Sequence, residues 1–320
     1  MNTAKFSLIV IAVGAAIMAF AHWFNVDYLY FASYTILQFI VLATAWNILG
    51  GYCGYVNFGS AAFFAMGAYS SVFLHKYFEE LLPVPVLILV GGMVSGTVGL
   101  GMGYLTLRLR GSFFAIATLA LAVVLGTLVV NWDFVGGSRG AYIIRPESIS
   151  FAGLTINYIE YLFGLMLLLA MIALITARTI ERSQLGVGFA TIRDDEMAAE
   201  ASGVPTLRVK LIATTLSGAF MGMAGAPFPY YIGYLQPSSA FGLEYAVNSI
   251  AMPMIGGTST WIGPLVGAVL LGTAQQYVTV TISSAVNLLI VGLMLVGFVI
   301  IAPNGIVGLV QNRLRAWRRP

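Results

Sequence analysis

The residues with the greatest potential for chemistry lie in one charged segment, residues 178–210. This segment spans 33 residues and carries five basic and five acidic side chains. They are Arg178, Arg182, Arg193, Arg208 and Lys210 on the basic side, and Glu181, Asp194, Asp195, Glu196 and Glu200 on the acidic side. A polybasic lipid anchor would carry one sign of charge. The balance therefore favours contact with a partner protein or with solvent.

Residues 188–202 of this segment predict a helix, which Gly203 and Pro205 would end. A short charged helix of this kind can be a solvated connector, or it can be a knob that docks into another protein. Three of its charged side chains, Arg193, Glu196 and Glu200, fall near one face at helical spacing.

A second candidate, residues 136–140 (GGSRG), has the G-x-S-x-G pattern of a hydrolase nucleophile. Such a serine must lie between a strand and a helix, with a histidine and an acid brought to it. We expect no sheet in the surrounding loop, and neither His22 nor His75 is a plausible partner for Ser138. The pattern therefore predicts a glycine-rich turn, either plain or with amides that face a solute pathway.

The sequence contains no nucleotide-binding loop. A P-loop needs a glycine before a Lys-Ser or Lys-Thr pair, so that backbone amides and the lysine can hold phosphates. The lysines are Lys5, Lys76 and Lys210, and none is preceded by glycine or followed by serine or threonine. The chain is thus not predicted to be an ATPase or another enzyme, and we expect no cofactor, no metal and no nucleic acid.

The elements that must position these residues follow from the composition. Of 320 residues, 59% are hydrophobic and 8% are charged, and the mean hydropathy is +0.92. A soluble domain carries roughly 25% charged residues, and disulfides are excluded because Cys53 is the only cysteine. Since backbone amides in a bilayer must be satisfied within the chain, we expect an all-α polytopic membrane protein.

Runs of about 20 apolar residues mark the membrane segments. Ten are predicted: residues 6–24, 28–49, 54–74, 84–107, 111–131, 158–177, 211–232, a short 245–256, 262–282 and 286–302. They form a single transmembrane domain, residues 1–320, with an outer loop at 132–157 and a cytoplasmic loop at 178–210. Residues 1–21 resemble a signal peptide, but we expect an uncleaved first helix.

Basic residues orient these segments, because cytoplasmic loops are rich in lysine and arginine. With Lys5 inside, twelve basic residues lie on the inner side and three lie on the outer side. The inner set is Lys5, Arg108, Arg110, Arg178, Arg182, Arg193, Arg208, Lys210, Arg313, Arg315, Arg318 and Arg319; the outer set is Lys76, Arg139 and Arg145. Both termini are therefore predicted to be cytoplasmic.

The predicted segments contain one charged residue, Glu160, at an outer edge, and both histidines fall near outer helix ends. Proton-coupled carriers usually hold carboxylates or histidines within the membrane, so energy for uphill transport would come from a partner. Glycines in G-x-x-x-G spacing predict close helix packing. Prolines at 227, 229, 253 and 264 interrupt later segments, and broken helices at membrane depth often meet substrate.

Six stretches of this sequence resemble one family. They are residues 51–69 (GYCGYVNFGSAAFFAMGAY), 107–119 (LRLRGSFFAIATL) with the GGSRG loop, 192–204 (IRDDEMAAEASGV), 256–268 (GGTSTWIGPLVGA) and 303–309 (PNGIVGL). Together they look like the LivM-type permeases of branched-chain amino-acid ABC importers. Related permeases for urea or short amides share these motifs.

This resemblance implies an importer of the bacterial inner membrane with several subunits. A second homologous permease, two ATP-binding subunits that use ATP and Mg, and a periplasmic solute-binding protein would accompany this chain among membrane lipid. It also implies that residues 192–203 form the helix that couples to the ATPases, with Arg193, Asp194, Asp195, Glu196, Glu200 and Gly203 at the contact.

An interior without buried charge suits a neutral or zwitterionic solute. Polar side chains and the glycines of turns and helix breaks are the candidates for lining its pathway: Asn57, Gly59, Ser60, Gly137, Ser138, Asn248, Gly256 and Gly257. A self-sufficient channel or facilitator remains the alternative of a different class.

Overall fold

The computed structural model describes residues 3–24, 26–79, 81–106, 109, 111–151, 154–281, 287–302 and 305–317. Four residues of the inner basic set, Arg108, Arg110, Arg318 and Arg319, lie outside these ranges, as do Pro303 and Asn304 of the last family-like stretch. The long helices are α1 (Thr3–Phe24), α2 (Asp27–Asn47), α3 (Ser60–Tyr77), α4 (Val84–Thr106), α5 (Ser112–Val130), α6 (Tyr158–Glu181), α9 (Thr206–Gly225), α12 (Leu243–Gly256), α13 (Ile262–Thr281), α14 (Asn287–Ile301) and α15 (Gly305–Trp317).

Shorter elements connect them. They are the helices α7 (Gln184–Asp194), α8 (Glu196–Ala201), α10 (Phe228–Ile232) and α11 (Pro237–Ala240), the π turn η1 (Ile48–Tyr52), the 3₁₀ turns η2 (Asp133–Val135) and η3 (Gly137–Arg139), and the strands β1 (Ala141–Tyr142), β2 (Ser148–Phe151), β3 (Leu154–Asn157) and β4 (Tyr234–Leu235). Two antiparallel pairs form, β1 with β4 and β2 with β3. The expectation that the loop at residues 132–157 contains no sheet is therefore wrong. Its backbone amides and carbonyls, which lie outside the long helices, form hydrogen bonds between short strands instead.

Within the described residues, six helical stretches are long and apolar enough to cross a membrane. They are Thr3–Phe24, Asp27–Tyr52, Val84–Thr106, Phe113–Val130, Tyr158–Glu181 and Thr206–Ile232. The other four predicted segments coincide with α3, α12, α13 and α14. The all-helical polytopic class is thus confirmed, whereas the count of ten crossings stays a prediction.

Glycine allows α3, α4 and α9 to pack at close range. A Cβ atom at Gly67 would overlap the backbone of Gly222, and one at Gly222 would overlap Ser95 and the backbone of Gly91. Small residues let helix backbones approach. Cβ atoms at Gly218 on α9 and at Gly99 on α4 would each lie 3.0 Å from a carbonyl of the other helix, so these helices use G-x-x-x-G glycines for close packing. The bundle core therefore depends on helix backbones in direct contact.

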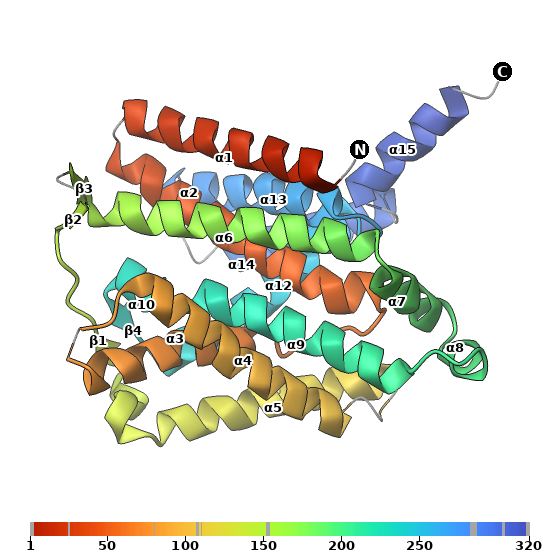
Figure 1. Ribbon diagram of the computed structural model, residues 1–320, viewed down its shortest axis with the longest axis horizontal. Helices are drawn as coiled ribbons and strands as arrows, with labels where there is room; N and C mark the ends of the chain where they lie inside the picture. The colour runs from red at the N-terminus through yellow and green to blue at the C-terminus, as the bar shows by residue number, and fades with distance from the viewer. Residues whose placement is uncertain are drawn as a thin grey trace.

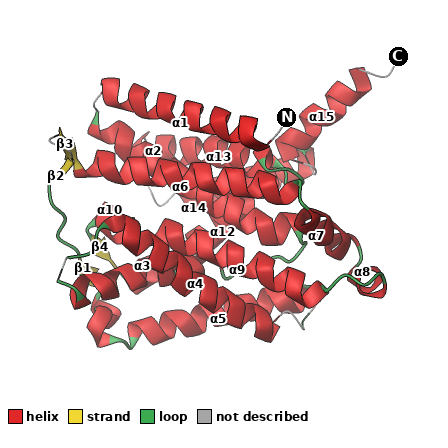
Figure 2. Ribbon diagram, viewed as in Figure 1, coloured by secondary structure: helices red, strands yellow, loops and turns green. Residues whose placement is uncertain are grey.

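The two ends of the bundle differ, as Figures 1 and 2 show. The four strands gather at one end, which we call the hairpin end. The start of α1, the helices α7 and α8, and the end of α15 lie at the opposite end, which we call the α7 end. The first and last described residues, Thr3 and Trp317, therefore lie at the same end of the bundle as the charged segment.

The third predicted segment begins later than expected. Residues 53–59 are not helical, and α3 begins at Ser60 instead of Gly54. Asn57 is the reason, because its side-chain oxygen accepts a hydrogen bond from the amide of Gly59 at 2.7 Å. Asparagine favours such local bonds over helix, so a non-helical stretch follows α2 and the π turn and separates them from α3.

Candidate functional site

The charged segment at the α7 end forms two helices, not the single helix predicted for residues 188–202. Ser183 caps α7 by accepting a hydrogen bond from the amide of Gly186 at 3.4 Å. Asp195 is extended (φ −159°, ψ 109°) and caps α8 by accepting from the amide of Ala198 at 3.0 Å. Aspartate is a preferred N-cap, and this cap breaks the helix between Asp194 and Glu196.

Glu196 points into the protein and not toward solvent. Its carboxylate pairs with the ammonium of Lys210 on α9 at 2.6 Å, and it also accepts a hydrogen bond from the hydroxyl of Tyr55. Lys210 is 3% exposed and the side chain of Glu196 is 13% exposed. The ammonium also donates to the hydroxyl of Tyr55 at 3.2 Å. This cluster of Tyr55, Glu196 and Lys210 ties α8 to the start of α9 and to the stretch before α3.

The other charged candidates lie nearer the surface. Arg193 donates to Asp194 at 3.2 Å, in an exposed pair. Glu200 accepts from the hydroxyl of Thr206 at 2.8 Å, and Gly203 is exposed with φ +84°. Because the helix breaks at Asp195, Arg193 does not share a continuous face with Glu196 and Glu200, which corrects that prediction.

Exposed apolar side chains accompany these charges on α7 and α8. Val187 is 65% exposed and Met197 is 63% exposed. Beside them lies a cleft of about 440 Å³, lined by Val187, Val204 and Val209 among others. Sequence reasoning missed these residues because it selected for charge, although two exposed apolar side chains in a polar segment are an ordinary sign of a contact surface.

The base of α6 is also joined to other helices at this end. The carboxylate of Glu181 accepts from the amide of Trp261 at 2.8 Å and from the hydroxyl of Tyr52 at 3.5 Å. Arg178 is buried and stacks over the ring of Phe6, 3.8 Å from its centroid. The predicted loop thus begins inside α6, and two of its charges serve packing between helices.

Lys210 was also placed outside the membrane segments, but α9 begins at Thr206 and includes it. The predicted start of this segment, residue 211, is therefore five residues later than the start of its helix. Glu160 itself is buried on α6 and pairs with Nδ1 of His22 at 2.8 Å. Glu160 and Lys210 thus each have a polar partner close by, which reduces the cost of burying a charge.

A small cavity of about 390 Å³ lies beneath α7, between residues 53–56 and the start of α5. Cys53, Tyr55, Arg193 and Glu196 contribute to its lining. Burial raises the pKa of the Cys53 thiol to about 12; Lys210 opposes this shift and Glu196 adds to it. The thiol is therefore neutral at physiological pH.

The pathway candidates near α3 are buried and locally bonded. Asn57 and Ser60 are buried, and Asn57 bonds the amide of Gly59 while its own carbonyl accepts from Trp46 at 2.9 Å. The side-chain nitrogen of Asn57 has no hydrogen-bond partner among the described residues. Asn47, on the preceding helix, is buried near Tyr52, and within the described part of the chain neither of its side-chain atoms makes a hydrogen bond of ordinary geometry. Sequence reasoning missed Asn47 because it lay within an apolar run.

The remaining pathway candidates are spread over the molecule. Asn248 is buried on α12 and accepts from Gln275 at 2.9 Å. Gly256 and Gly257 allow α12 to meet α13 and the start of α15, because a Cβ atom at Gly256 would overlap the carbonyl of Gly263. Gly137 is buried and Ser138 exposed in the 3₁₀ turn at the hairpin end. The structure does not bring these eight candidates into one cavity among those described here.

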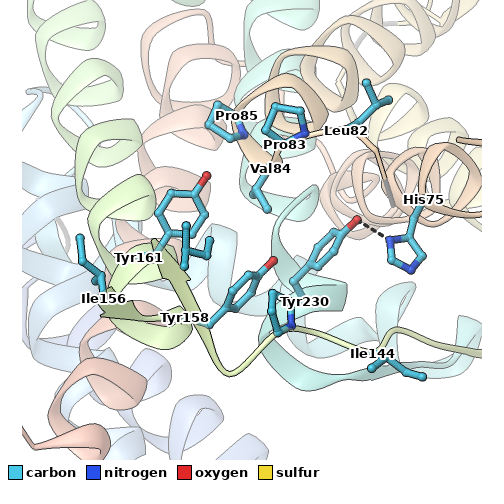
Figure 3. A pocket seen from close by; sticks show the side chains of 12 residues that line it. His75, Leu82, Pro83, Val84, Pro85, Ile144, Ile156, Tyr158, Tyr161 and Tyr230 are labelled. Carbon is cyan, nitrogen blue, oxygen red and sulfur yellow. Dashed lines mark hydrogen bonds between the residues drawn. The ribbon is translucent and has the colours of Figure 1, made fainter. Parts of the chain in front are cut away.

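The largest cavity described here, about 670 Å³, lies at the hairpin end (Figure 3). Its lining includes His75 on α3, Tyr158 and Tyr161 on α6, and Tyr230 on α10. Nδ1 of His75 lies 3.0 Å from the hydroxyl of Tyr230. None of these residues was a sequence candidate, because tyrosines near helix ends are typical of any membrane interface.

Comparison with known proteins gives one family. The profile described as "Branched-chain amino acid transport system / permease component" matches residues 28–299. The permease LivM of Salmonella typhimurium, from a high-affinity branched-chain amino acid transport system, is 27% identical over 303 residues, which cover 87% of this chain and 69% of that protein.

Two further relatives extend this likeness. LivM of Escherichia coli is 26% identical with the same coverage. A probable branched-chain permease, LivH, of Methanocaldococcus jannaschii is 24% identical over 81% of this chain and 85% of its own. No solved structure matches the chain. The resemblance drawn from its motifs is confirmed, and the chain belongs to the permease-component family of branched-chain amino acid transport systems.

Proposed function

We propose that this chain is the permease subunit of an ATP-driven importer in the bacterial inner membrane, with a branched-chain or similar neutral or zwitterionic amino acid as its solute. Members of this family are permease components and are not themselves catalytic. ATPase and binding-protein partners follow in general from the family. The proposed set is a second homologous permease, two ATP-binding subunits that hold ATP and Mg, and a periplasmic solute-binding protein.

The observation that carries this proposal is the construction of α7 and α8. Their outer surface carries Val187 and Met197, while Glu196 holds α8 to the bundle through Lys210 and Tyr55. A segment that receives movement from an ATPase needs an exposed contact surface and a firm inner attachment. We propose that Val187, Met197 and the exposed charges make the contact, and that Glu196 transmits it.

The broken helices give this movement a route into the membrane. Tyr55 belongs to the non-helical stretch after the π turn η1, and Glu181 holds both Tyr52 of that turn and the amide of Trp261 before α13. Interrupted helices are the usual movable parts of transporters. We propose that displacement of α8 shifts this stretch and the loop before α13 together, which alternates access to the pathway.

The buried polar side chains support a solute without net charge. Asn47, Asn57 and Asn248 offer amide groups, and each has at least one buried side-chain atom that makes no hydrogen bond of ordinary geometry with the described residues. Of the three buried charges described above, Glu160 and Lys210 are each paired within the chain, and Arg178 stacks on the ring of Phe6. An amide side chain can bind both hydrogen-bond donors and hydrogen-bond acceptors. These side chains therefore fit an amino acid or a short amide better than an ion.

The contact with the ATPases is tested by co-purification in mild detergent. We expect Met197→Asp to release the ATP-binding subunits while the chain remains in the membrane. Ile144→Asp is the matched control, because Ile144 is 81% exposed at the hairpin end. Retention of the ATPases by the Met197 variant, or by a chain lacking residues 186–203, would overturn the coupling role.

The solute is tested separately, on the binding protein that co-purifies. Isothermal titration with leucine, urea and acetamide distinguishes an amino-acid importer from a urea or amide importer. Reconstitution of the chain alone tests the remaining class: solute flux without ATPases would indicate a self-sufficient channel or facilitator.

A further inference from the structure

A groove lies next to the cavity at the hairpin end. This groove, about 330 Å³, lies between α4 and α6 and over the surface of α9. Pro85 lines both the cavity and the groove, so the two are neighbours. The groove is lined by Pro85, Ile88, Leu89, Leu165, Leu168, Leu169, Ile172, Phe220 and Met223, all apolar.

One face of α6 lines both the cavity and the groove, and its side chains change from tyrosine to aliphatic along the helix. Tyr158 and Tyr161 line the cavity, and Leu165, Leu168 and Ile172 line the groove. Their spacing of three and four residues places them on one face of the helix. This face therefore has a hydrogen-bonding end and an apolar remainder. From Tyr161 to Ile172 the helix rises about 16 Å, close to the roughly 15 Å of hydrocarbon in one leaflet.

The polar end suits the head of an amphiphile that carries a phosphate. The hydroxyls of Tyr158 and Tyr161 point toward residues 82–85 across the cavity, and the hydroxyl of Tyr230 points toward His75 (Figure 3). Among the described residues that line the cavity, none is acidic. Arg145 brings a positive charge to this end, because its guanidinium donates to the carbonyls of Tyr230 and Tyr231 at 3.1 and 2.9 Å. Neutral donors beside a cation complement a phosphodiester.

We propose that the cavity and the groove together bind one membrane phospholipid, with its phosphate end among the tyrosines of the cavity and one acyl chain in the groove between α4 and α6. Exposed apolar side chains border the groove on both helices, Leu89 on α4 and Leu168 and Ile172 on α6. They mark this surface as one that faces hydrocarbon. The lipid fills a gap that the helices leave open and joins α6 to α4.

Native mass spectrometry of the protein purified in mild detergent tests this proposal. We expect one phospholipid to stay bound to each wild-type chain. Leu168→Trp fills the groove and removes that lipid, whereas Ile116→Trp on α5 retains it. Both positions carry a branched aliphatic side chain on a helix, and the exposed fraction is 50% for Leu168 and 64% for Ile116. Equal retention by both variants would overturn the proposal.

Further measurements test whether the acyl chain is needed for binding in addition to the phosphate headgroup. They also test whether a second protein, and not lipid, covers the groove. Dipalmitoyl phosphatidylglycerol should rebind to delipidated protein, and glycerophosphate should not compete with it. Competition by glycerophosphate would mean a site for free phosphate compounds, without an acyl chain. Efficient cross-linking of Ile172→Cys to a second permease, in a Cys53→Ser background, would show that protein and not lipid covers the groove.

Discussion

Replacement of Lys210 by methionine is the sharpest test of the attachment between α8 and the bundle. The ammonium and the carboxylate of Glu196 are 2.6 Å apart and both are largely buried. With an effective dielectric constant of about 20, Coulomb attraction at this separation is roughly 6 kcal/mol, and the cost of desolvating both ions offsets much of it. Removal of one member of a buried pair costs about 3–5 kcal/mol, because the other charge is left uncompensated. Since Glu196 keeps some exposure, we expect a loss of about 3 kcal/mol.

The assay is a double-mutant cycle on the free energy of unfolding, from denaturant titrations in mixed micelles followed by tryptophan fluorescence. Lys210→Met and Glu196→Gln should each destabilise the protein. The double variant should lose less than the sum, with a coupling energy of about 2 kcal/mol, within the range for residues in contact. Arg193→Gln is the control, because its pair with Asp194 is exposed and exposed pairs contribute at most about 1 kcal/mol.

A coupling energy below about 0.5 kcal/mol would refute the reasoning. It would mean that Glu196 and Lys210 act independently, and that other contacts of α8, such as the bond from Tyr55 to Glu196, hold it to the bundle. Equal effects of the Arg193 and Lys210 substitutions would lead to the same conclusion.

Three further predictions concern other parts of the chain. Because the thiolate is the reactive form and burial raises the pKa of Cys53 to about 12, N-ethylmaleimide at pH 7.5 should label Cys53 only after denaturation; labelling of the folded protein at the denatured rate contradicts this. Gly225→Ala should destabilise by about 1–3 kcal/mol, since the new methyl group would overlap a carbonyl of α3; Gly292→Ala, with open space around it, should not destabilise in the same titration. Asp195→Ala should cost about 1 kcal/mol of local stability and speed amide exchange in α8, whereas Asp195→Asn should preserve the cap; equal exchange in both would exclude capping.

Much of this fold could be predicted from the sequence because apolar length alone marks a membrane helix. The segment predicted at residues 84–107 is α4, Val84–Thr106, and that predicted at residues 158–177 is contained in α6. The family could also be identified from the sequence, since its motifs are short and each lies within one stretch of the chain. These features depend on residues close together in the chain.

The errors occurred where local bonds or distant partners compete with the apolar pattern. The bond from Gly59 to Asn57 delays the start of α3, and the cap at Asp195 divides one predicted helix into two. Both residues are polar and stand next to good helix formers, so the sequence is compatible with either outcome. The structure shows that both helices begin shortly after these polar residues. The side chain of Asn57 or Asp195 accepts a hydrogen bond from a backbone amide near the new helix start, whereas a continuous helix would bond that amide to a carbonyl of the preceding turn.

The sequence by itself determined that this chain is a helical membrane protein and a transport permease component, with its charge gathered in one segment. Only the tertiary structure decided which of those charges face inward. Glu196 is 14 positions from Lys210 and 141 from Tyr55 along the chain, and no periodicity relates them. Burial of a charge depends on whether a partner from another element can reach it, and that is a property of the packed helices.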